Sequence, residues 1–157
     1  MQDRKRVALV IGAGSGMGRA SAEALASAGH IVVIADRDFE SAKRAAEAVN
    51  ADGGEAVAYE IDGASVAQLK AMFLYIEKTY ARLNVLFSNI GSRGANGYDL
   101  TEAQFDEVFD VNVKSHFFAT HYAVPLMKLC APQASIIYMA SAAAFKAGGG
   151  SPLSSIS

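Results

Sequence analysis

Four glycines at alternating positions follow a short apolar run near the N-terminus of the 157-residue chain. They are Gly12, Gly14, Gly16 and Gly18, directly after Val7 to Ile11. Small residues let a backbone turn tightly and approach a ligand without Cβ clashes, and the N-terminus of a helix that begins there offers unpaired N–H groups to a phosphate. Because Met17 occupies the third glycine position of a strict G-x-G-x-x-G pattern, the spacing that fits is Gly12-x-x-x-Gly16-x-Gly18. The segment predicts a pyrophosphate cradle, and a glycine-rich turn without a ligand is the alternative.

The second apolar run, Ile31 to Ala35, ends in the acid Asp36. In a strand-helix-strand unit this position lies beside the first glycine turn, so its carboxylate can accept hydrogen bonds from the ribose 2′-OH of an adenosine and would repel a 2′-phosphate. The glycine turn carries Ser15 and no basic residue, which also favours NAD over NADP. Two alternatives stay open: Asp36 could cap the next helix, and Arg37 could accept NADP.

Polar residues also follow the later apolar runs. Asp62 and Gly63 follow Glu55 to Ile61; Asn89, Ile90 and Gly91 follow Asn84 to Ser88; and Ser141 follows Ser135 to Ala140. The carboxyl ends of parallel strands meet at one edge of a sheet, and ligands bind there. We therefore expect the glycine turn and the polar residues at the strand ends to surround one crevice.

Helical periodicity separates the apolar runs. Helices are expected over Gly16 to Ala28, over Phe39 to Asn50, from Ser65 to Tyr80, and after Thr101, the last being long and interrupted near Pro125. Ser65 with Gln68 and Thr101 with Gln104 have the spacing of capping boxes, and Gly29 is expected to end the first helix. This alternation predicts an α/β fold: a Rossmann-type, doubly wound parallel sheet with strand order 3-2-1-4-5, because crossovers between parallel strands are right-handed.

Composition narrows the class of protein. With 52% hydrophobic residues, residues 1–157 are expected to form a single domain with a sizeable core. A net charge of −2 without a basic stripe argues against a nucleic-acid partner, and no uncharged run is long enough for a membrane span. The single Cys130 and the glycines that interrupt a leader-like N-terminus favour a cytoplasmic protein. His30, His116 and His121 lack the spacing of metal ligands, so we expect no metal.

In order and spacing, these residues resemble the short-chain dehydrogenase/reductase family from about Val7 onward. The cofactor turn of the family matches Gly12-x-x-x-Gly16-x-Gly18, with Ile11 where threonine is usual. The resemblance implies that this turn, with Ser15 and Met17, holds a nicotinamide dinucleotide, that Asp36 is the acid of NAD-preferring members, and that Asp62 with Gly63 contacts the adenine. The segment Ser88-Asn89-Ile90-Gly91 looks like the family's Asn-Asn-Ala-Gly, with two of its four positions changed.

The family's reaction is hydride transfer between the nicotinamide ring and an alcohol or carbonyl carbon. The resemblance implies that Ser141 binds the substrate oxygen and that Asn112 holds a water in the proton relay. In the family a tyrosine, whose pKa is lowered by a lysine four residues later, exchanges the proton, but Ser154 stands at its position and the lysine would come after Ser157. No tyrosine of the chain is followed by lysine four positions later. We therefore expect the 157-residue chain to be catalytically inactive.

The resemblance also implies that the C-terminal strands and helices of the family fold are missing. The fifth strand is then expected to be an exposed edge, and homo-oligomer formation or aggregation is expected. Three functions compete: an oxidoreductase acting on a small-molecule alcohol or carbonyl compound, a non-catalytic dinucleotide-binding module or pseudoenzyme, and a methyltransferase. The methyltransferase explains least, because it requires neither Asn89 nor Asn112 nor Ser141.

Overall fold

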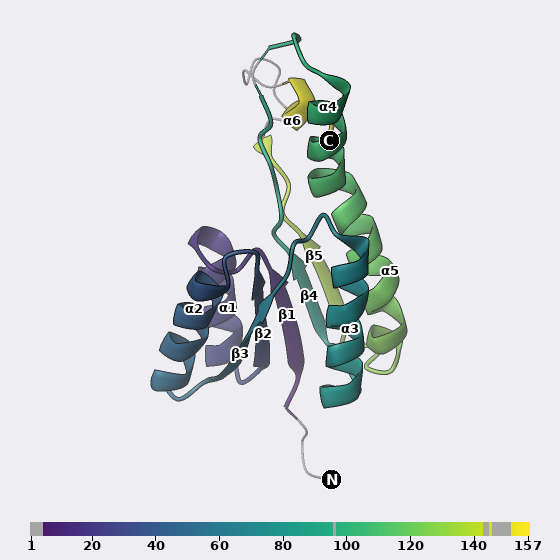
Figure 1. The fold of residues 1–157 in the computed structure, drawn as a ribbon. Helices are drawn as coiled ribbons and strands as arrows, with labels where there is room; N and C mark the ends of the chain where they lie inside the picture. The colour runs from purple at the N-terminus through teal and green to yellow at the C-terminus, as the bar shows by residue number, and fades with distance from the viewer. Residues whose placement is uncertain (1–4, 96, 143–144, 146–151) are drawn as a thin grey trace.

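The computed structural model describes residues 5–95, 97–142, 145 and 152–157, and its elements follow the predicted alternation (Figure 1). Five parallel strands form one sheet in the order β3-β2-β1-β4-β5, which confirms the predicted topology. The strands are β1 (Val7–Ile11), β2 (Ile31–Asp36), β3 (Glu55–Glu60), β4 (Val85–Ser88) and β5 (Ser135–Tyr138). The helices are α1 (Gly16–Ser27), α2 (Phe39–Ala51), α3 (Val66–Tyr80), α4 (Glu102–Phe109), the π-helix η1 (Asp110–Lys114), α5 (Ser115–Lys128) and α6 (Pro152–Ile156).

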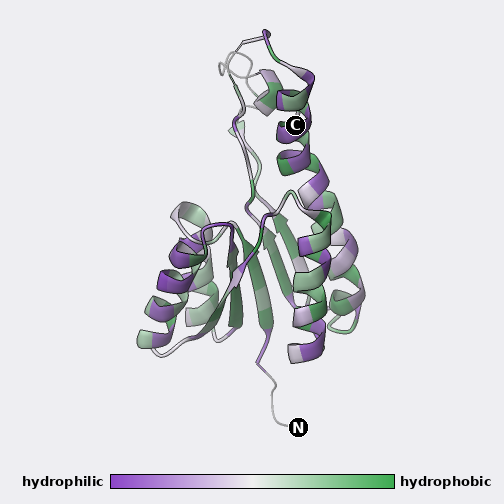
Figure 2. Ribbon diagram, in the orientation of Figure 1, coloured by the Kyte–Doolittle hydropathy of each residue, from purple (hydrophilic) through white to green (hydrophobic). Residues whose placement is uncertain are grey.

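Helices cover both faces of the sheet, because its inner strands are apolar on both sides. In Figure 1, α1 and α2 lie on one face and α3 and α5 on the other. Residues of β1 alternate between the two cores: Ala8 and Val10 pack with α1 and α2, whereas Leu9 and Ile11 pack with α3 and α5. Figure 2 shows the strands as largely hydrophobic ribbons between helices of mixed polarity.

The centre of the sheet is the point where its winding reverses. β1 pairs with β2 on one side and with β4 on the other. The loops after β1 and β4 therefore leave the same edge of the sheet next to each other, at the place where ligands bind in open α/β sheets.

The predicted long helix is divided into α4, η1 and α5. The capping box at its start is confirmed, since Thr101 Oγ1 accepts a hydrogen bond from Gln104 N and Gln104 Oε1 accepts one from Thr101 N. The predicted interruption near Pro125 is wrong. α5 continues through this proline to Lys128, because the neighbouring Leu126 and Met127 are buried in the core. The irregular turn is η1, which contains Asn112.

Other local predictions differ from the structure in detail, whereas the one at Gly29 is confirmed. The capping box at Ser65 is half formed, because Gln68 Oε1 accepts a hydrogen bond from Asp62 N instead of Ser65 N. β5 ends at Tyr138, before the predicted end at Ala140. Gly29 has the expected left-handed conformation after α1, with a φ of +85°.

The short helix α6 was not predicted by periodicity. Its Leu153 is buried, and its side chain lies near Gly94 in the loop after β4. Burial of Leu153 holds α6, and with it Ser154, beside the loop after β4.

Candidate functional site

The glycine turn between β1 and α1 is held by Asn89 from the end of β4. Asn89 Nδ2 donates a hydrogen bond to the carbonyl oxygen of Gly12 at 2.9 Å, and the φ of Gly12 is +78°. A Cβ at Gly18 would lie 2.1 Å from that carbonyl oxygen and 2.7 Å from Asn89 Nδ2. Glycine is therefore required at both positions, by backbone conformation at Gly12 and by close packing at Gly18.

The N-terminus of α1 faces outward from this turn. Ser15 is the N-cap residue, but its side chain makes no capping hydrogen bond. Apart from its chain neighbours and the backbone of α1, no heavy atom of the described residues lies within 4 Å of the place where a Cβ on Gly16 would stand. Uncapped N–H groups beside open space are what a phosphate needs, so the turn fits the predicted pyrophosphate.

Asp36, the last residue of β2, reaches across to the same turn. Its Oδ2 accepts a hydrogen bond from Gly14 N at 2.8 Å, and its Oδ1 accepts one from Asp38 N at 3.0 Å. The cap of α2 is Asp38, whose side chain accepts a hydrogen bond from Ser41 N. Hydrogen bonds from the Ser41 side chain and backbone hold the pKa of the Asp38 carboxyl below its usual value. Asp36 is thus attached to the glycine turn, and a different acid caps the helix.

Arg37 and Asp62 lie together beside the ends of β2 and β3. They line a cavity of about 390 Å³ with Tyr59, Glu60 and Gln68. Gly63, the next residue after Asp62, is buried against Ile90, because a Cβ on Gly63 would lie 2.3 Å from Ile90 Cδ1. Close packing therefore connects the loop after β3 to the segment after β4.

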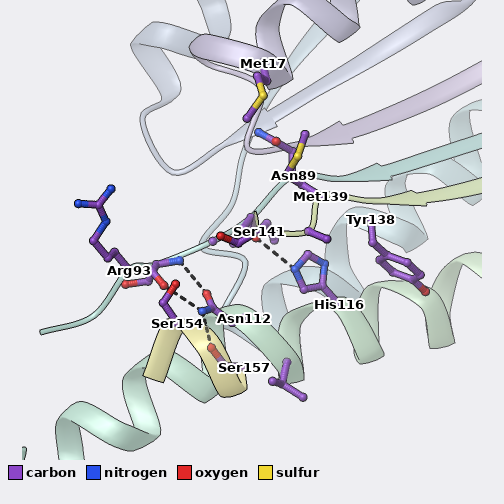
Figure 3. A pocket seen from close by; sticks show the side chains of 15 residues that line it. Met17, Asn89, Arg93, Asn112, His116, Tyr138, Met139, Ser141, Ser154 and Ser157 are labelled. Carbon is purple, nitrogen blue, oxygen red and sulfur yellow. Dashed lines mark hydrogen bonds between the residues drawn. The ribbon is translucent and has the colours of Figure 1, made fainter. Parts of the chain in front are cut away.

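A larger cavity of about 820 Å³ opens at the carboxyl ends of β4 and β5 (Figure 3). Its lining contains the predicted cofactor residues Met17, Asn89, Ile90 and Gly91 and the predicted catalytic positions Asn112, Ser141 and Ser154. In Figure 3, Met17 and Asn89 lie at one end of the cavity, Asn112 and Ser154 lie at the other, and Ser141 lies between them. The structure therefore brings these seven residues together, whereas Arg37 and Asp62 line the separate smaller cavity.

Asn112 connects two segments at one end of this cavity. Its Oδ1 accepts a hydrogen bond from Ser92 N at 2.7 Å, and its Nδ2 donates to the Ser92 carbonyl oxygen at 2.9 Å. The same Nδ2 donates to Ser157 Oγ at 2.8 Å. Asn112 therefore positions both the loop after β4 and the residue that follows α6.

His116 is a residue of this site that sequence reasoning missed. Its ring lines the larger cavity and makes hydrogen bonds with Ser88 Oγ at 2.7 Å and the Ile90 carbonyl oxygen at 3.1 Å. Burial lowers the pKa of the imidazole below its usual value, an effect opposed by the hydrogen bond to Ile90. The signal in the sequence was its place one helical turn after Asn112, which puts both side chains on one face of the helix.

Metal-ligand clusters and membrane-spanning helices are both absent from the described residues. In residues 5–95, 97–142, 145 and 152–157, no three His, Cys, Asp or Glu side chains gather as a group that could hold a metal ion. The helices in these same ranges are too short or too polar to cross a membrane.

Comparison with known proteins points to one family. The model of the short chain dehydrogenase family matches residues 6–154. Cyclohexanol dehydrogenase of Acinetobacter sp. (strain SE19) is 34% identical over 140 residues, which cover 88% of this chain and 55% of that protein. The 7alpha-hydroxysteroid dehydrogenase of Escherichia coli (strain K12) is 28% identical over 123 residues, which cover 78% of this chain and 48% of that protein.

A solved structure shows the same fold. A 7 alpha-hydroxysteroid dehydrogenase complexed with NADH and 7-oxo glycochenodeoxycholic acid superimposes with a TM-score of 0.89 at 28% identity. The match covers 96% of this chain and 59% of that one. The chain spans about half the length of the curated relatives it matches.

Proposed function

The chain belongs to the short chain dehydrogenase family, and we propose that it holds the cofactor of an NAD-dependent oxidoreductase. The reaction is hydride transfer between the nicotinamide and the carbon of a small-molecule alcohol or carbonyl compound. One observation carries this proposal: Asn89 holds the glycine turn through Gly12 and also lines the cavity that contains Asn112 and Ser141. Cofactor residues and catalytic positions thus border the same space.

The residues present fit a dinucleotide along this edge of the sheet. The outward-facing N-terminus of α1 offers backbone N–H groups to the pyrophosphate from Ser15, Gly16, Met17 and Gly18. The Asp36 carboxylate, held by Gly14 N, is placed to accept hydrogen bonds from the adenosine ribose. The adenine belongs in the cavity beside Asp62, Gly63 and Arg37, and the nicotinamide riboside belongs beside Asn89, Ile90 and Gly91. When bound, the nicotinamide supplies or accepts the hydride.

The same carboxylate is the reason to propose NAD over NADP. Asp36 has both oxygens fixed by backbone N–H donors, so it cannot turn away from a ribose phosphate without losing two hydrogen bonds. A 2′-phosphate placed beside it would be repelled. Arg37 is exposed and lies at the adjoining cavity, so it is the residue of this area that favours NADP.

Three residues of the chain bear on the chemistry at the substrate. Ser141 is exposed in the segment that follows β5 and lines the cavity, where its hydroxyl can hydrogen-bond a substrate oxygen. Asn112 positions the loop on the opposite side. Ser154 occupies the position of the family's tyrosine, and a serine hydroxyl is too weak an acid to replace a lysine-activated phenol. We therefore propose that this 157-residue chain binds cofactor without turnover.

The relatives support the class of substrate. Cyclohexanol dehydrogenase is named for an alcohol, and the similar solved structure holds NADH with a 7-oxo compound. An alcohol and its carbonyl product are the two states of one substrate in hydride transfer. A second candidate, a dinucleotide-binding module or pseudoenzyme, is favoured by Ser154.

Calorimetric titration of the chain with NADH and NADPH tests the proposal. We expect NADH to bind more tightly than NADPH. In Asp36→Ala we expect the ratio of the two affinities to fall about tenfold, because one charge-assisted hydrogen bond to the ribose is lost. Glu40→Ala is the matched control, because it removes an exposed acid from the first turn of α2 and changes the net charge by the same amount. Equal affinities for the two cofactors would contradict the proposed preference for NAD, and an unchanged preference in Asp36→Ala would show that another residue causes it.

The proposal also covers the oligomeric state and the cellular location of the protein. Apolar side chains on α5 and β5 are exposed, among them Phe117 and Ile137. Such surfaces promote association, so we propose a homo-oligomer. We also propose that it works in the cytoplasm, where its single Cys130 would stay reduced.

A further inference from the structure

The imidazole of His116 joins α5 to two residues that flank Asn89. Its Nδ1 lies 2.7 Å from Ser88 Oγ, and its Nε2 lies 3.1 Å from the carbonyl oxygen of Ile90. Ser88 is completely buried at the end of β4, while His116 is half-buried in the first turn of α5. The ring therefore bridges a helix and the exit of the central strand.

The partners of the ring determine its tautomer. A backbone carbonyl can only accept a hydrogen bond, so Nε2 carries the proton that is shared with Ile90. In the neutral ring Nδ1 is then an acceptor, and the Ser88 hydroxyl donates to it. Both nitrogens are used in binding the segment, so neither is left to exchange a proton with a substrate.

His116 holds residues 88–91, the segment at the exit of β4, and this segment organises the proposed cofactor site. Asn89, between the two anchored residues, donates its side-chain hydrogen bond to the Gly12 carbonyl oxygen. Ile90 packs against Gly63 in the loop after β3. Asn89, Ile90 and Gly91 also border the larger cavity. A shift of this segment would therefore change both the lining of the cavity and the hydrogen bond that holds the glycine turn.

We propose that His116 is a positioning residue for the nicotinamide riboside half of the cofactor, acting through Ser88 and Ile90 on Asn89 and Gly91. This inference rests on the proposed function, because it presumes that the larger cavity receives that half. The imidazole acts on the cofactor only through the segment, and the adenosine half, bound beside Asp36 and Asp62, is outside its reach.

Titrations of NADH and of AMP, which carries only the adenosine half, test this proposal. His116→Leu removes both hydrogen bonds, and we expect it to raise the Kd for NADH about tenfold, as the loss of one or two hydrogen bonds would, with the Kd for AMP within about twofold of the original. His121→Leu is the matched control, since His121 lies on the same helix and its ring contacts are with Phe118 and Tyr122.

Two conservative variants separate the two hydrogen bonds. The end of an Asn side chain reaches the place of Nδ1 and can accept from Ser88, whereas the end of a Gln side chain reaches the place of Nε2 and can donate to Ile90. We expect His116→Asn and His116→Gln each to recover part of the NADH affinity that His116→Leu loses. If His116→Leu does not fold, these two variants carry the test, with NADH affinities weaker than that of the unchanged chain and AMP affinities preserved.

The pH dependence adds a readout that a merely structural role would not move. The titratable or charged groups around the ring are Tyr138 of β5, whose ring stands edge-on at 5.7 Å, Arg93 across the larger cavity and His121 on α5. No carboxylate among the described residues lines either cavity that His116 borders, so the Ile90 carbonyl is the group that favours the charged imidazole, and burial outweighs it. Because burial lowers the pKa of His116 from its usual value, we expect NADH affinity to fall as the pH drops through this lowered pKa in the unchanged chain and to stay level in His116→Gln.

The outcomes are distinguishable. If the unchanged chain binds no NADH, the proposed function fails and the inference fails with it. If the chain binds NADH but His116→Leu binds it equally well, or loses AMP and NADH affinity by the same factor, only the inference about His116 is overturned.

Discussion

Every residue of β1 is at most 1% exposed, whereas in β5 Ile137 and Tyr138 expose 47% and 50% of their surface. The first region, here the glycine-turn region, comprises β1, its turn and Asn89. The second, here the β5 region, comprises β5, Ser141 and the exposed face of α5. In the glycine-turn region positions are fixed by close packing, as the 2.1 Å approach at Gly18 shows. In the β5 region the predicted catalytic Ser141 lies in an exposed segment after the strand, and the other predicted hydroxyl, that of Ser154, lies nearby on the short helix α6.

The proposed cofactor site and the predicted catalytic positions thus differ in how firmly the fold holds them. The glycine turn is held by contacts among residues before position 92. The predicted catalytic positions Ser141 and Ser154 lie in segments that are partly exposed. His116 connects the two regions, because it binds the exit of β4 and also meets Tyr138 of β5.

The largest expected effect concerns turnover, which depends on the β5 region and not on the glycine turn alone. We expect the 157-residue chain to show no NADH oxidation with ketones above background, because a general acid contributes about 10² to 10⁴ in rate and Ser154 does not supply one. Ser154→Tyr alone should not restore activity, since a phenol without a neighbouring lysine keeps a pKa near 10. Changes in NADH absorbance over a panel of ketones and secondary alcohols measure this.

A longer chain provides the matched positive control. Extending the protein beyond Ser157 with a lysine and a following helix, in the Ser154→Tyr background, should produce activity. Turnover by the unextended chain with Ser154 would show that the proton comes from another group.

The second prediction compares two glycines of the glycine-turn region: Gly18, which is closely packed, and Gly16, which faces open space. Gly18→Ala should lower the free energy of unfolding by about 3 kcal/mol, because its Cβ would overlap a backbone oxygen and the Asn89 amide. Gly16→Ala meets open space at a φ of +55°, so it should cost only about 1 kcal/mol in stability while still weakening NADH binding. Urea unfolding followed by circular dichroism measures both, and equal destabilisation by the two variants would contradict this account of the turn.

The third prediction concerns the exposed surface of the β5 region. We expect the chain to self-associate and Ile137→Lys to weaken this association by about tenfold, because charge on a sheet edge opposes pairing. Leu74→Lys is the control, since Leu74 is a similarly exposed apolar residue on α3. Sedimentation velocity over a concentration series is the measurement. A monomer at all concentrations would mean that the exposed face has no tendency to associate.

The smallest expected effect concerns the N-terminal cap of α4. Thr101→Ala removes the complete capping box of α4 and should cost about 1 kcal/mol of stability. Ser65→Ala removes a half-formed box, whose Gln68 side chain remains bound to Asp62 N, and should cost less. A larger loss from Ser65→Ala in urea unfolding would reverse this ranking.

Local sequence was sufficient for much of the fold. The alternation of strands and helices followed from apolar runs separated by helical periodicity, and the order of strands in the sheet followed from right-handed crossovers. The Thr101 capping box and the left-handed Gly29 were also predictable, because each depends on residues a few positions apart. The prediction at Pro125 was wrong, since the local cost of a proline is outweighed by burial of its neighbours in a core that periodicity alone does not measure.

Spacing along the chain was enough to predict that the residues following the strands, such as Asp36 and Asn89, lie at the carboxyl edge of the sheet, because it sets where strands end and turns begin. Asn112 and Ser154 were expected there only from the family resemblance, and His116 was missed. Their pairing there became visible only in the folded molecule: Asn112 with Ser92 and Ser157, His116 with Ser88 and Ile90, and Asp36 with Gly14. The partners in each of these pairs lie at least 20 residues apart. Hydrogen bonds over such separations depend on how the helices pack on the sheet, and the spacing of residue types along the chain does not encode that packing.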